Sequence, residues 1–304
     1  MKTLVVLMLC CLLNFFSAPL SAAPDNTLSI MSFNIRYGSA RDGSNHWNLR
    51  KDMVFSVLED QQPDVVGLQE ALGFQINQIT DAVPGYSSIG VGREDGKTKG
   101  EYTALLYRSD RFTVQDSSTF WLSETPNVVA SMSWNTACTR ICTWALLKDK
   151  ISERTFYVYN LHLDHVSQEA REKGVKLVLE RIAQRKTLAP AFVTGDFNAG
   201  EKNRAITQIK EPTFEVKPDT TTTPKTVHLI DTFRVVHPDA KPVGTFNSWK
   251  GTTTGAKIDY VFAMDHLNIL SADILRMHRN DRYPSDHFPV IATVAWPEVK
   301  KARR

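Results

Sequence analysis

The sequence predicts an α+β fold in which two packed, mainly antiparallel β-sheets are flanked by helices, a four-layer α/β/β/α sandwich. First, short apolar runs rich in β-branched and aromatic residues recur along the 304 residues. Second, helical periodicity separates only some of these runs, which argues against a doubly wound parallel sheet. Third, 42% of the residues are hydrophobic, which is enough apolar material for a large packed core.

Several apolar runs have the length and composition of strands. They span residues 28–34, 64–68, 102–107, 143–147, 155–161, 191–194, 258–263 and 289–294. No internal repeat is visible among them, so we expect a single domain rather than an array of repeated units.

Helical spacing of apolar residues appears over residues 47–61 and 170–185, and residues 74–83 form a third candidate helix. The first of these helices ends before Pro63, which cannot continue a helix. The Thr- and Pro-rich residues 212–226 have the composition of a surface loop that interrupts the domain without dividing it.

Residues 1–23 have the features of a secretory signal. Lys2 is the positive start, an uncharged apolar run follows, and small residues precede Pro24 as a cleavage site. A retained membrane anchor is the alternative, although the apolar run is shorter than the ~20 residues of a spanning helix. We therefore expect a secreted or periplasmic protein with one domain at residues 24–298 and a basic tail at residues 299–304.

Charge and cysteine content exclude some classes of protein. Loss of Lys2 with the signal lowers the formal net charge from +3 to +2, so nothing demands a polyanionic partner. Cys10 and Cys11 leave with the signal, and Cys138 and Cys142 remain. Two cysteines cannot frame a disulfide scaffold. Both a small disulfide and a pair of buried thiols fit their spacing. The sequence carries no sign of the oligomeric state.

Four predicted strands end abruptly in polar side chains, which places those groups at the rim of a sheet. The groups are Asn34, Glu70, His162 and the pair Asp196 and Asn198. One such ending is typical of a turn or a helix cap. Four of them together indicate a functional rim.

Two further polar groups extend this set. Asp259 lies inside an apolar run, where an unpaired carboxylate is costly to bury, and Asp286 and His287 precede the last strand. Oxygen ligands with two imidazoles and no thiolate suit Mg²⁺ or Mn²⁺ better than a structural zinc. Such an ion neutralises phosphate charge and activates water, so the residues predict hydrolysis of phosphate esters.

Six short motifs carry these residues in a fixed order. They are Ser32-Phe33-Asn34, Leu68-Gln69-Glu70, Asn160-Leu161-His162, Gly195-Asp196-Phe197-Asn198, Ile258-Asp259-Tyr260 and Ser285-Asp286-His287. In these motifs the chain resembles the endonuclease/exonuclease/phosphatase superfamily over nearly its whole mature length. With the predicted signal, the resemblance implies a secreted, divalent-metal-dependent phosphoesterase that hydrolyses phosphodiester or phosphomonoester bonds by in-line attack of water.

The resemblance also implies a role for each motif residue. Glu70 is then the principal ligand of Mg²⁺, or of Mn²⁺, and Asn34 and Asp286 lie close to the ion or its waters. Asp196 orients or deprotonates the attacking water, and Asn198 holds this water and a phosphate oxygen.

Two imidazoles are expected beside this centre. His287 resembles the group that acts as base or binds the scissile phosphate, and His162 resembles an acid for the leaving oxygen. A carboxylate should fix the tautomer of each ring. Glu101 and Asp259 are the candidates, and which carboxylate serves which ring stays open. Arg36 stands where abasic-site endonucleases have an Asp, so one contact near the metal is missing or supplied elsewhere.

Three residues are expected to touch the substrate. Arg140 falls where the deoxyribonuclease of this family places a phosphate-contacting Arg, and Phe246 and Trp249 are candidates to stack on a base or a sugar. The alternatives are a solvated charge for Arg140 and ordinary packing for the two rings.

The chain is most similar to a group of exported bacterial members that share the motifs at residues 47–50, 120–123 and 162–165. The last of these motifs is also found in part in binuclear zinc hydrolases, but Asn160 stands where that site has a His. At the rim, Asp164 or His165 would contact the substrate or form an ordinary hydrogen bond.

Small phosphodiesters and phosphates of sugars, inositol or nucleotides are the expected substrates. A nuclease is less favoured because no basic stripe interleaved with aromatics precedes the C-terminal tail, although nucleic acid is not excluded. A sphingomyelinase-like phospholipid phosphodiesterase would need an exposed apolar hairpin, which the sequence lacks. A catalytically silent binding protein on the same fold is the last alternative. The intact Glu70, Asp196, Asn198 and His287 argue against it.

Overall fold

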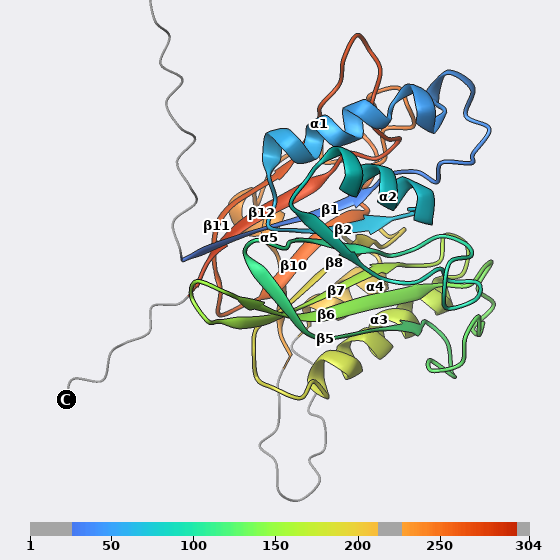
Figure 1. Ribbon diagram of the computed structural model, residues 1–304. Coiled ribbons are helices and arrows are strands. Elements are labelled where there is room, and N and C mark those ends of the chain that lie inside the picture. Colours follow the sequence, from blue (N-terminus) through green and yellow to red (C-terminus); the bar gives the residue numbers. More distant parts are fainter. Residues whose placement is uncertain (1–25, 212–226, 297–304) are drawn as a thin grey trace, which may run out of the picture.

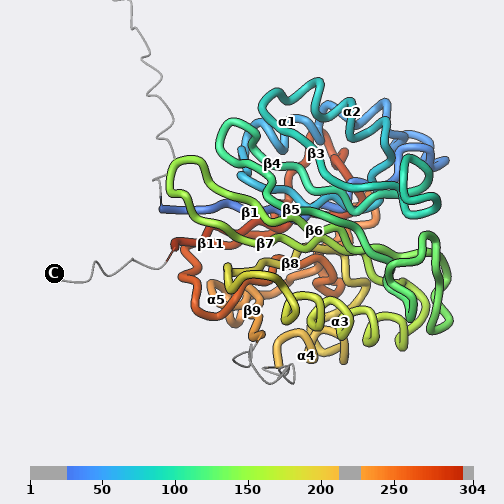
Figure 2. Tube along the Cα trace, turned by 60° about the horizontal axis from the view of Figure 1, so that its bottom comes forward, coloured from blue at the N-terminus to red at the C-terminus, as the bar shows by residue number. Residues whose placement is uncertain are grey.

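Two six-stranded sheets pack face to face in the computed structural model, which describes residues 26–211 and 227–296 (Figure 1). Helices α1 (Lys51–Gln61) and α2 (Gly73–Ala82) lie on the outer side of the first sheet. Helix α3 (Gln168–Ala183) lies on the outer side of the second sheet, as the turned view also shows (Figure 2). The predicted four-layer α/β/β/α sandwich is thereby confirmed.

Three predicted segments lie outside the described residues. They are the signal at residues 1–23, the loop at residues 212–226 and the tail at residues 299–304. Among the residues that the structure does describe, no helix has the length and apolar character needed to cross a membrane.

The first sheet has the strand order β11-β12-β1-β2-β4-β3. Its strands are β1 (Thr27–Asn34), β2 (Val65–Gln69), β3 (Tyr86–Ile89), β4 (Leu105–Arg108), β11 (Asn268–Ile274) and β12 (Val290–Ala295). Neighbouring strands are antiparallel except β1 and β2, which run parallel with Asn34 opposite Gln69. The carboxyl ends of these two central strands therefore meet at one edge of the sheet.

The second sheet has the strand order β5-β6-β7-β8-β10-β9. Its strands are β5 (Phe112–Trp121), β6 (Ile141–Asp149), β7 (Thr155–His162), β8 (Ala191–Asp196), β9 (Leu229–Asp231) and β10 (Asp259–Met264). Only β7 and β8 are parallel, with His162 opposite Asp196, and antiparallel β10 places Asp259 on the other side of Asp196. Three polar residues thus stand side by side at the end of this sheet.

The strands that the sequence did not predict are the edges of the two sheets. β11 and β3 border the first sheet, and β5 and β9 border the second. Edge strands such as β5 and β11 expose many of their side chains, so they lack the continuous apolar run by which a buried strand is recognised. The predicted strand at residues 102–107 begins only at Leu105, because Tyr102 forms an isolated bridge to Ala71.

The predicted helices are confirmed with shifted ends. The segment at residues 47–61 begins with a 3₁₀ turn, Trp47–Leu49, before α1 starts at Lys51. Two short helices, α4 (Arg204–Lys210) and α5 (Thr232–Val236), were not predicted. Each spans two turns or fewer, which is too short for a helical pattern to stand out.

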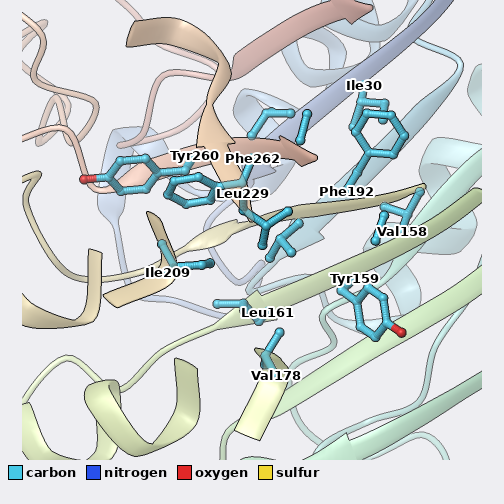
Figure 3. Close-up of a cluster of buried hydrophobic side chains, with 14 of the residues drawn as sticks. Ile30, Val158, Tyr159, Leu161, Val178, Phe192, Ile209, Leu229, Tyr260 and Phe262 are labelled. Carbon is cyan, nitrogen blue, oxygen red and sulfur yellow. The ribbon is translucent and has the colours of Figure 1, made fainter. Parts of the chain in front are cut away.

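A continuous apolar core fills the space between the two sheets and beneath α3 and α4 (Figure 3). Ile30 of β1 and Val158 of β7 contribute from the two sheets, and Val178 of α3 and Ile209 of α4 close the outer face. A second cluster packs α1 and α2 on the first sheet. Burial of these side chains holds the strands rigidly beneath the polar rim.

A buried polar network joins the two sheets just below that rim. The Nδ2 of Asn160, on β7, donates to the carbonyl oxygens of Leu68 (2.8 Å) and Ala104 (2.9 Å) in the first sheet. Its Oδ1 accepts from Gln69 Nε2 (2.6 Å) and Thr194 Oγ1 (3.1 Å). One amide therefore bonds to both sheets with all of these groups removed from water.

Gly67 of β2 allows the sheets to approach at this point. A Cβ atom on residue 67 would lie 2.2 Å from Thr194 Oγ1 and 2.5 Å from Asn160 Oδ1. Any side chain here would push the sheets apart, so glycine is required for the Asn160 network to close.

We expect Asn160→Leu to lower the free energy of unfolding by about 3–5 kcal/mol, since it leaves several buried donors and acceptors unpaired at about 1–3 kcal/mol each. Urea denaturation followed by circular dichroism measures the change. Ser117→Ala, on the exposed edge strand β5, is the control and should change stability by less than about 0.5 kcal/mol. Equal stability of the two variants would contradict the role given to Asn160.

Candidate active site

A cavity of about 640 Å³ opens at the end of the sandwich where the central strands of both sheets finish. Most of the predicted site residues line it. They are Glu70, Glu101, Arg140, His162, Asp196, Asn198, Phe246, Trp249, Asp286 and His287. The other two, Asn34 and Asp259, are fully buried directly behind lining residues. Tertiary structure thus gathers all the predicted residues around one pocket.

Asp196 lies at the centre of this pocket. Its Oδ2 accepts a hydrogen bond from Asn34 Nδ2 (2.9 Å), and its Oδ1 accepts from the backbone N–H of Asn198 (2.9 Å). The Nε2 atoms of His162 and His287 stand 3.4 Å and 3.8 Å from Oδ2. Burial, together with the charge of Asp259, raises the pKa of Asp196 to about 7.

His287 is held by a buried carboxylate. Its Nδ1 lies 2.9 Å from Asp259 Oδ2, which leaves Nε2 facing Asp196. Burial lowers the pKa of His287, but the charges of Asp259, Asp196 and Asp286 outweigh it and raise the pKa well above its usual value. His287 is therefore the protonated imidazole of the pocket, and Asp259 fixes its tautomer.

The pKa of His162 is shifted in the opposite direction to that of His287. The Nε2 of His162 accepts a hydrogen bond from Asn198 Nδ2 (3.0 Å). Burial, with the positive charges of Arg140 and Arg93, lowers the pKa of His162 well below its usual value. In this arrangement the Nε2 atom accepts from Asn198 and so orients that amide.

Glu101, a candidate from sequence to fix the tautomer of a histidine ring, pairs with an arginine instead. Its two carboxylate oxygens accept from Arg93 Nη1 and Nη2, both at 2.9 Å. Arg93 also lines the pocket and was missed by the sequence analysis. It stands in a loop with no motif around it, so only its pairing with Glu101 in space draws attention to it.

Glu70 and Asp286 present carboxylates to a common space. Both carboxylates lie near the guanidinium of Arg36, at 3.8 Å for Glu70 and 3.9 Å for Asp286. Asp42 holds this guanidinium at 2.9 Å. Burial raises the pKa of Asp286, and the charge of Glu70 adds to the effect. Two hard oxygen donors that repel one another fit a divalent cation such as Mg²⁺ or Mn²⁺.

Asn34 supports these carboxylates from behind. Its Nδ2 donates to Glu70 Oε1 (3.1 Å) as well as to Asp196, and its Oδ1 accepts from the backbone N–H of Arg36 (3.0 Å). The amide nitrogen therefore positions both carboxylates. Glu70 itself has a φ of 58°, a left-handed conformation that turns its side chain back into the pocket.

The His162-Leu163-Asp164-His165 segment orients Arg140. The Nη2 of Arg140 lies 2.9 Å from His165 Nδ1, and its Nε is 3.7 Å from Asp164. Asp164 also accepts from four donors in the neighbouring turns, and it offers a ligand atom within 4.8 Å of those of Cys138 and His165. Cys138 lines the same side, and both Cys138 and Cys142 are free thiols.

Aromatic side chains form the opposite wall. Phe246 is 43% exposed and meets the His287 ring edge to face at 5.1 Å between centroids. Ser248 and Trp249 both have left-handed backbone angles, with φ of 55° and 61°. This strained turn is held by Asn247 Oδ1, which accepts from Trp249 N at 2.8 Å.

Comparison with known proteins agrees with this fold. The sequence profile described as the Endonuclease/Exonuclease/phosphatase family matches residues 31–287. A curated relative, the uncharacterized protein L388 of Acanthamoeba polyphaga mimivirus, is 23% identical over 256 residues, which is 81% of this chain and 91% of that protein.

Solved structures are similar over most of the chain. The endonuclease/exonuclease/phosphatase from Bacteroides vulgatus is 35% identical with a TM-score of 0.78, covering 90% of this chain and 100% of its own. A mannosyl-6-phosphatase of Bacteroides thetaiotaomicron is 30% identical with a TM-score of 0.76, covering 88% and 100%. The human Nocturnin catalytic domain, at 19% identity, shares the fold, with a TM-score of 0.68 and coverage of 89% and 93%.

We expect Asp259→Asn to lower the pKa of His287, because burial then acts without the nearest opposing charge. In the unchanged protein the ring should stay protonated at neutral pH, whereas in the variant it should lose its proton at a lower pH. Nuclear magnetic resonance of the histidine rings in chelator-treated protein measures both values. Asp110→Asn, an exposed carboxylate paired with Arg108, is the control. A His287 titration that is the same in both variants would refute the pairing.

Proposed function

The chain belongs to the endonuclease/exonuclease/phosphatase family of hydrolases that act on phosphate esters, and from this and the signal-like residues 1–23 we propose that it is an exported, divalent-metal-dependent phosphoesterase. The observation that carries the proposal is the position of Asp196. It stands between the imidazoles of His162 and His287, and Asn34 links it to the carboxylate of Glu70. That arrangement can activate water and bind a phosphoryl group at the same place.

We assign the metal to Glu70 and Asp286, with Asn34 keeping Glu70 in place. When bound, Mg²⁺ or Mn²⁺ neutralises phosphate charge and stabilises the departing oxygen. The cation would share the space that Arg36 now faces. Arg36 is tied to Asp42, so its charge can remain at the edge of the site.

The proton of the attacking water goes to Asp196. A carboxylate whose pKa is about 7 is well matched to accept a proton near neutral pH. Asn34 and Asn198 fix its two oxygens, so the lone pairs that remain are directed into the pocket. His287 donates from Nε2 to the phosphoryl oxygens, where negative charge grows in the transition state.

His162 then has a positioning role in place of the acid role expected from sequence. Its Nε2 accepts from one Asn198 N–H, and the backbone carbonyl of Leu163 accepts the other at 3.0 Å. The amide oxygen of Asn198 is thereby left to face the pocket and the attacking water.

For the substrate we propose a small phosphorylated molecule, first of all a sugar phosphate. Phe246 and Trp249 offer an aromatic wall on one side of the cavity, and Arg140 offers positive charge on another. Aromatic faces beside polar groups suit a sugar ring. The similarity to a mannosyl-6-phosphatase, at 30% identity and nearly full coverage, supports the same choice.

We expect turnover of mannose 6-phosphate, p-nitrophenyl phosphate or bis-p-nitrophenyl phosphate with Mg²⁺ or Mn²⁺, and none with a chelator. Asp196→Ala should lower kcat by about 10²–10⁴-fold, since it removes the general base. Release of phosphate or nitrophenol measures the rates, with Asp110→Ala as the control. Metal-independent turnover, or no turnover of these esters or of DNA, RNA and sphingomyelin, would overturn the proposal.

Export is tested separately on the full chain. We expect the protein made in a bacterium to be recovered from the periplasm or the medium with a new N-terminus near Pro24, as read by N-terminal sequencing. Leu7→Arg places a charge in the apolar run and should keep the protein in the cytoplasm, whereas Thr3→Ser should be exported normally. Recovery of the unsubstituted protein from the cytoplasm at full length would contradict export.

A further inference from the structure

We propose that Arg50 is a positioning residue that fixes the metal-binding edge of the pocket and its aromatic wall relative to each other. Arg50 belongs to the Trp47–Arg50 motif, which the proposed reaction leaves without a role. It does not line the cavity and lies almost completely buried behind it. The inference rests on the proposed metal site, because Arg50 is argued to fix the backbone that carries its ligands.

The guanidinium of Arg50 joins two segments that are far apart in sequence. Its Nη1 donates to the carbonyl oxygens of Ile35 and Pro284, both at 2.8 Å. Its Nη2 donates to the carbonyl of Arg36 at 3.0 Å, and its Nε to that of Asn45 at 2.9 Å. Ile35 and Arg36 directly follow Asn34, and Pro284 stands two residues before Asp286. One planar group thus sets the distance between the two backbones that carry metal-site residues.

Arg50 also supports the aromatic wall. Its guanidinium carbon lies 5.1 Å from the ring centroid of Trp47 and 5.1 Å from that of Trp249. Trp47 is buried against the first sheet, whereas Trp249 lines the cavity. Cation–π contacts on both rings hold Trp249 at a fixed place on the wall.

The contacts of Arg50 explain why a charge is tolerated there. Each of its hydrogen bonds goes to a backbone carbonyl, and within residues 26–211 and 227–296 no carboxylate forms an ion pair with it. Burial lowers the pKa of Arg50 to about 10, while the charges of Asp286 and Asp42 favour the cation. A buried charge without an ion-pair partner is costly. The hydrogen bonds of Arg50 to backbone carbonyls offset this cost, and an apolar residue could not form them.

The planar fork is the feature that a lysine cannot replace. An ammonium group is a compact charge and cannot reach carbonyls spread around a guanidinium plane while packing between two rings. One of those carbonyls belongs to Arg36, whose φ is 56°. The same carbonyl oxygen accepts a hydrogen bond from Gln75 Nε2 at 3.0 Å. Loss of the fork would release this strained turn and let Asp286 move away from Glu70.

The test is direct binding of Mn²⁺ to purified protein, measured by calorimetry and by the electron paramagnetic resonance signal of free Mn²⁺. We expect Arg50→Lys to weaken Mn²⁺ binding by about 10–100-fold, the range found when a residue that orients metal ligands is changed. The KM for substrate should rise as well, because Trp249 loses its support.

The matched control is Arg185→Lys. Arg185 is also a buried arginine that donates to backbone carbonyls, from Nε to Ala189 at 3.0 Å and from Nη1 to Ile182 at 2.8 Å. It lies beyond the end of α3, outside the pocket lining. We expect this variant to lose stability without losing affinity for Mn²⁺, which separates positioning from general destabilisation.

Unchanged Mn²⁺ affinity in folded Arg50→Lys, or an equal loss in Arg185→Lys, would overturn the inference. If Arg50→Lys does not fold, Trp47→Phe keeps the guanidinium and weakens one of its aromatic contacts. Trp47→Phe should then also lower the affinity for Mn²⁺, and an unchanged affinity would contradict the positioning role of Arg50. Failure of the unsubstituted protein to bind Mn²⁺ would instead contradict the proposed metal site itself.

Discussion

The arrangement of the pocket depends on the buried hydrogen bonds of Asn160. This side chain leaves β7 and bonds to the carbonyls of Leu68 and Ala104 in the opposite sheet, while it accepts from Gln69 and Thr194. Apolar packing alone tolerates sliding of one sheet over the other, whereas a set of directional bonds in a low dielectric does not. The network therefore fixes how the ends of the central strands of the two sheets face one another.

Charge in the pocket follows from that fixed spacing. Asp196 and His287 are buried so close to the carboxylate of Asp259 that its charge raises the pKa of both groups. The same burial acts on His162 without a carboxylate hydrogen-bonded to its ring, and the neighbouring Arg140 and Arg93 keep it neutral. Two identical side chains thus acquire opposite states because one has a buried carboxylate partner and the other has cationic neighbours.

The centre and the rim of the pocket are built differently. Asp196, His162 and Asp259 stand at the ends of buried strands, where the core holds them rigidly. Phe246 and Trp249 stand on loops that reach over the strand ends. The groups proposed to carry the chemistry thus stand on the sheets, and the side chains proposed to contact the substrate stand on the loops. Arg50 connects the two regions, because it contacts both the backbone beside the proposed metal ligands and the ring of Trp249.

The sequence by itself determined the buried strands, the longer helices and most of the residues around the pocket. Strand ends such as Asp196 and Asn198 could be found because an apolar run that stops at a polar group is a local pattern. The sheet edges β3, β5, β9 and β11 could not, since exposed strands have no such run.

Tertiary structure alone decided which side chains became partners. Glu101 pairs with Arg93, Asn34 turns its nitrogen to Glu70, and Arg50 reaches a carbonyl 234 residues away. Local sequence cannot encode these choices, because each depends on distances that exist only after the two sheets have packed.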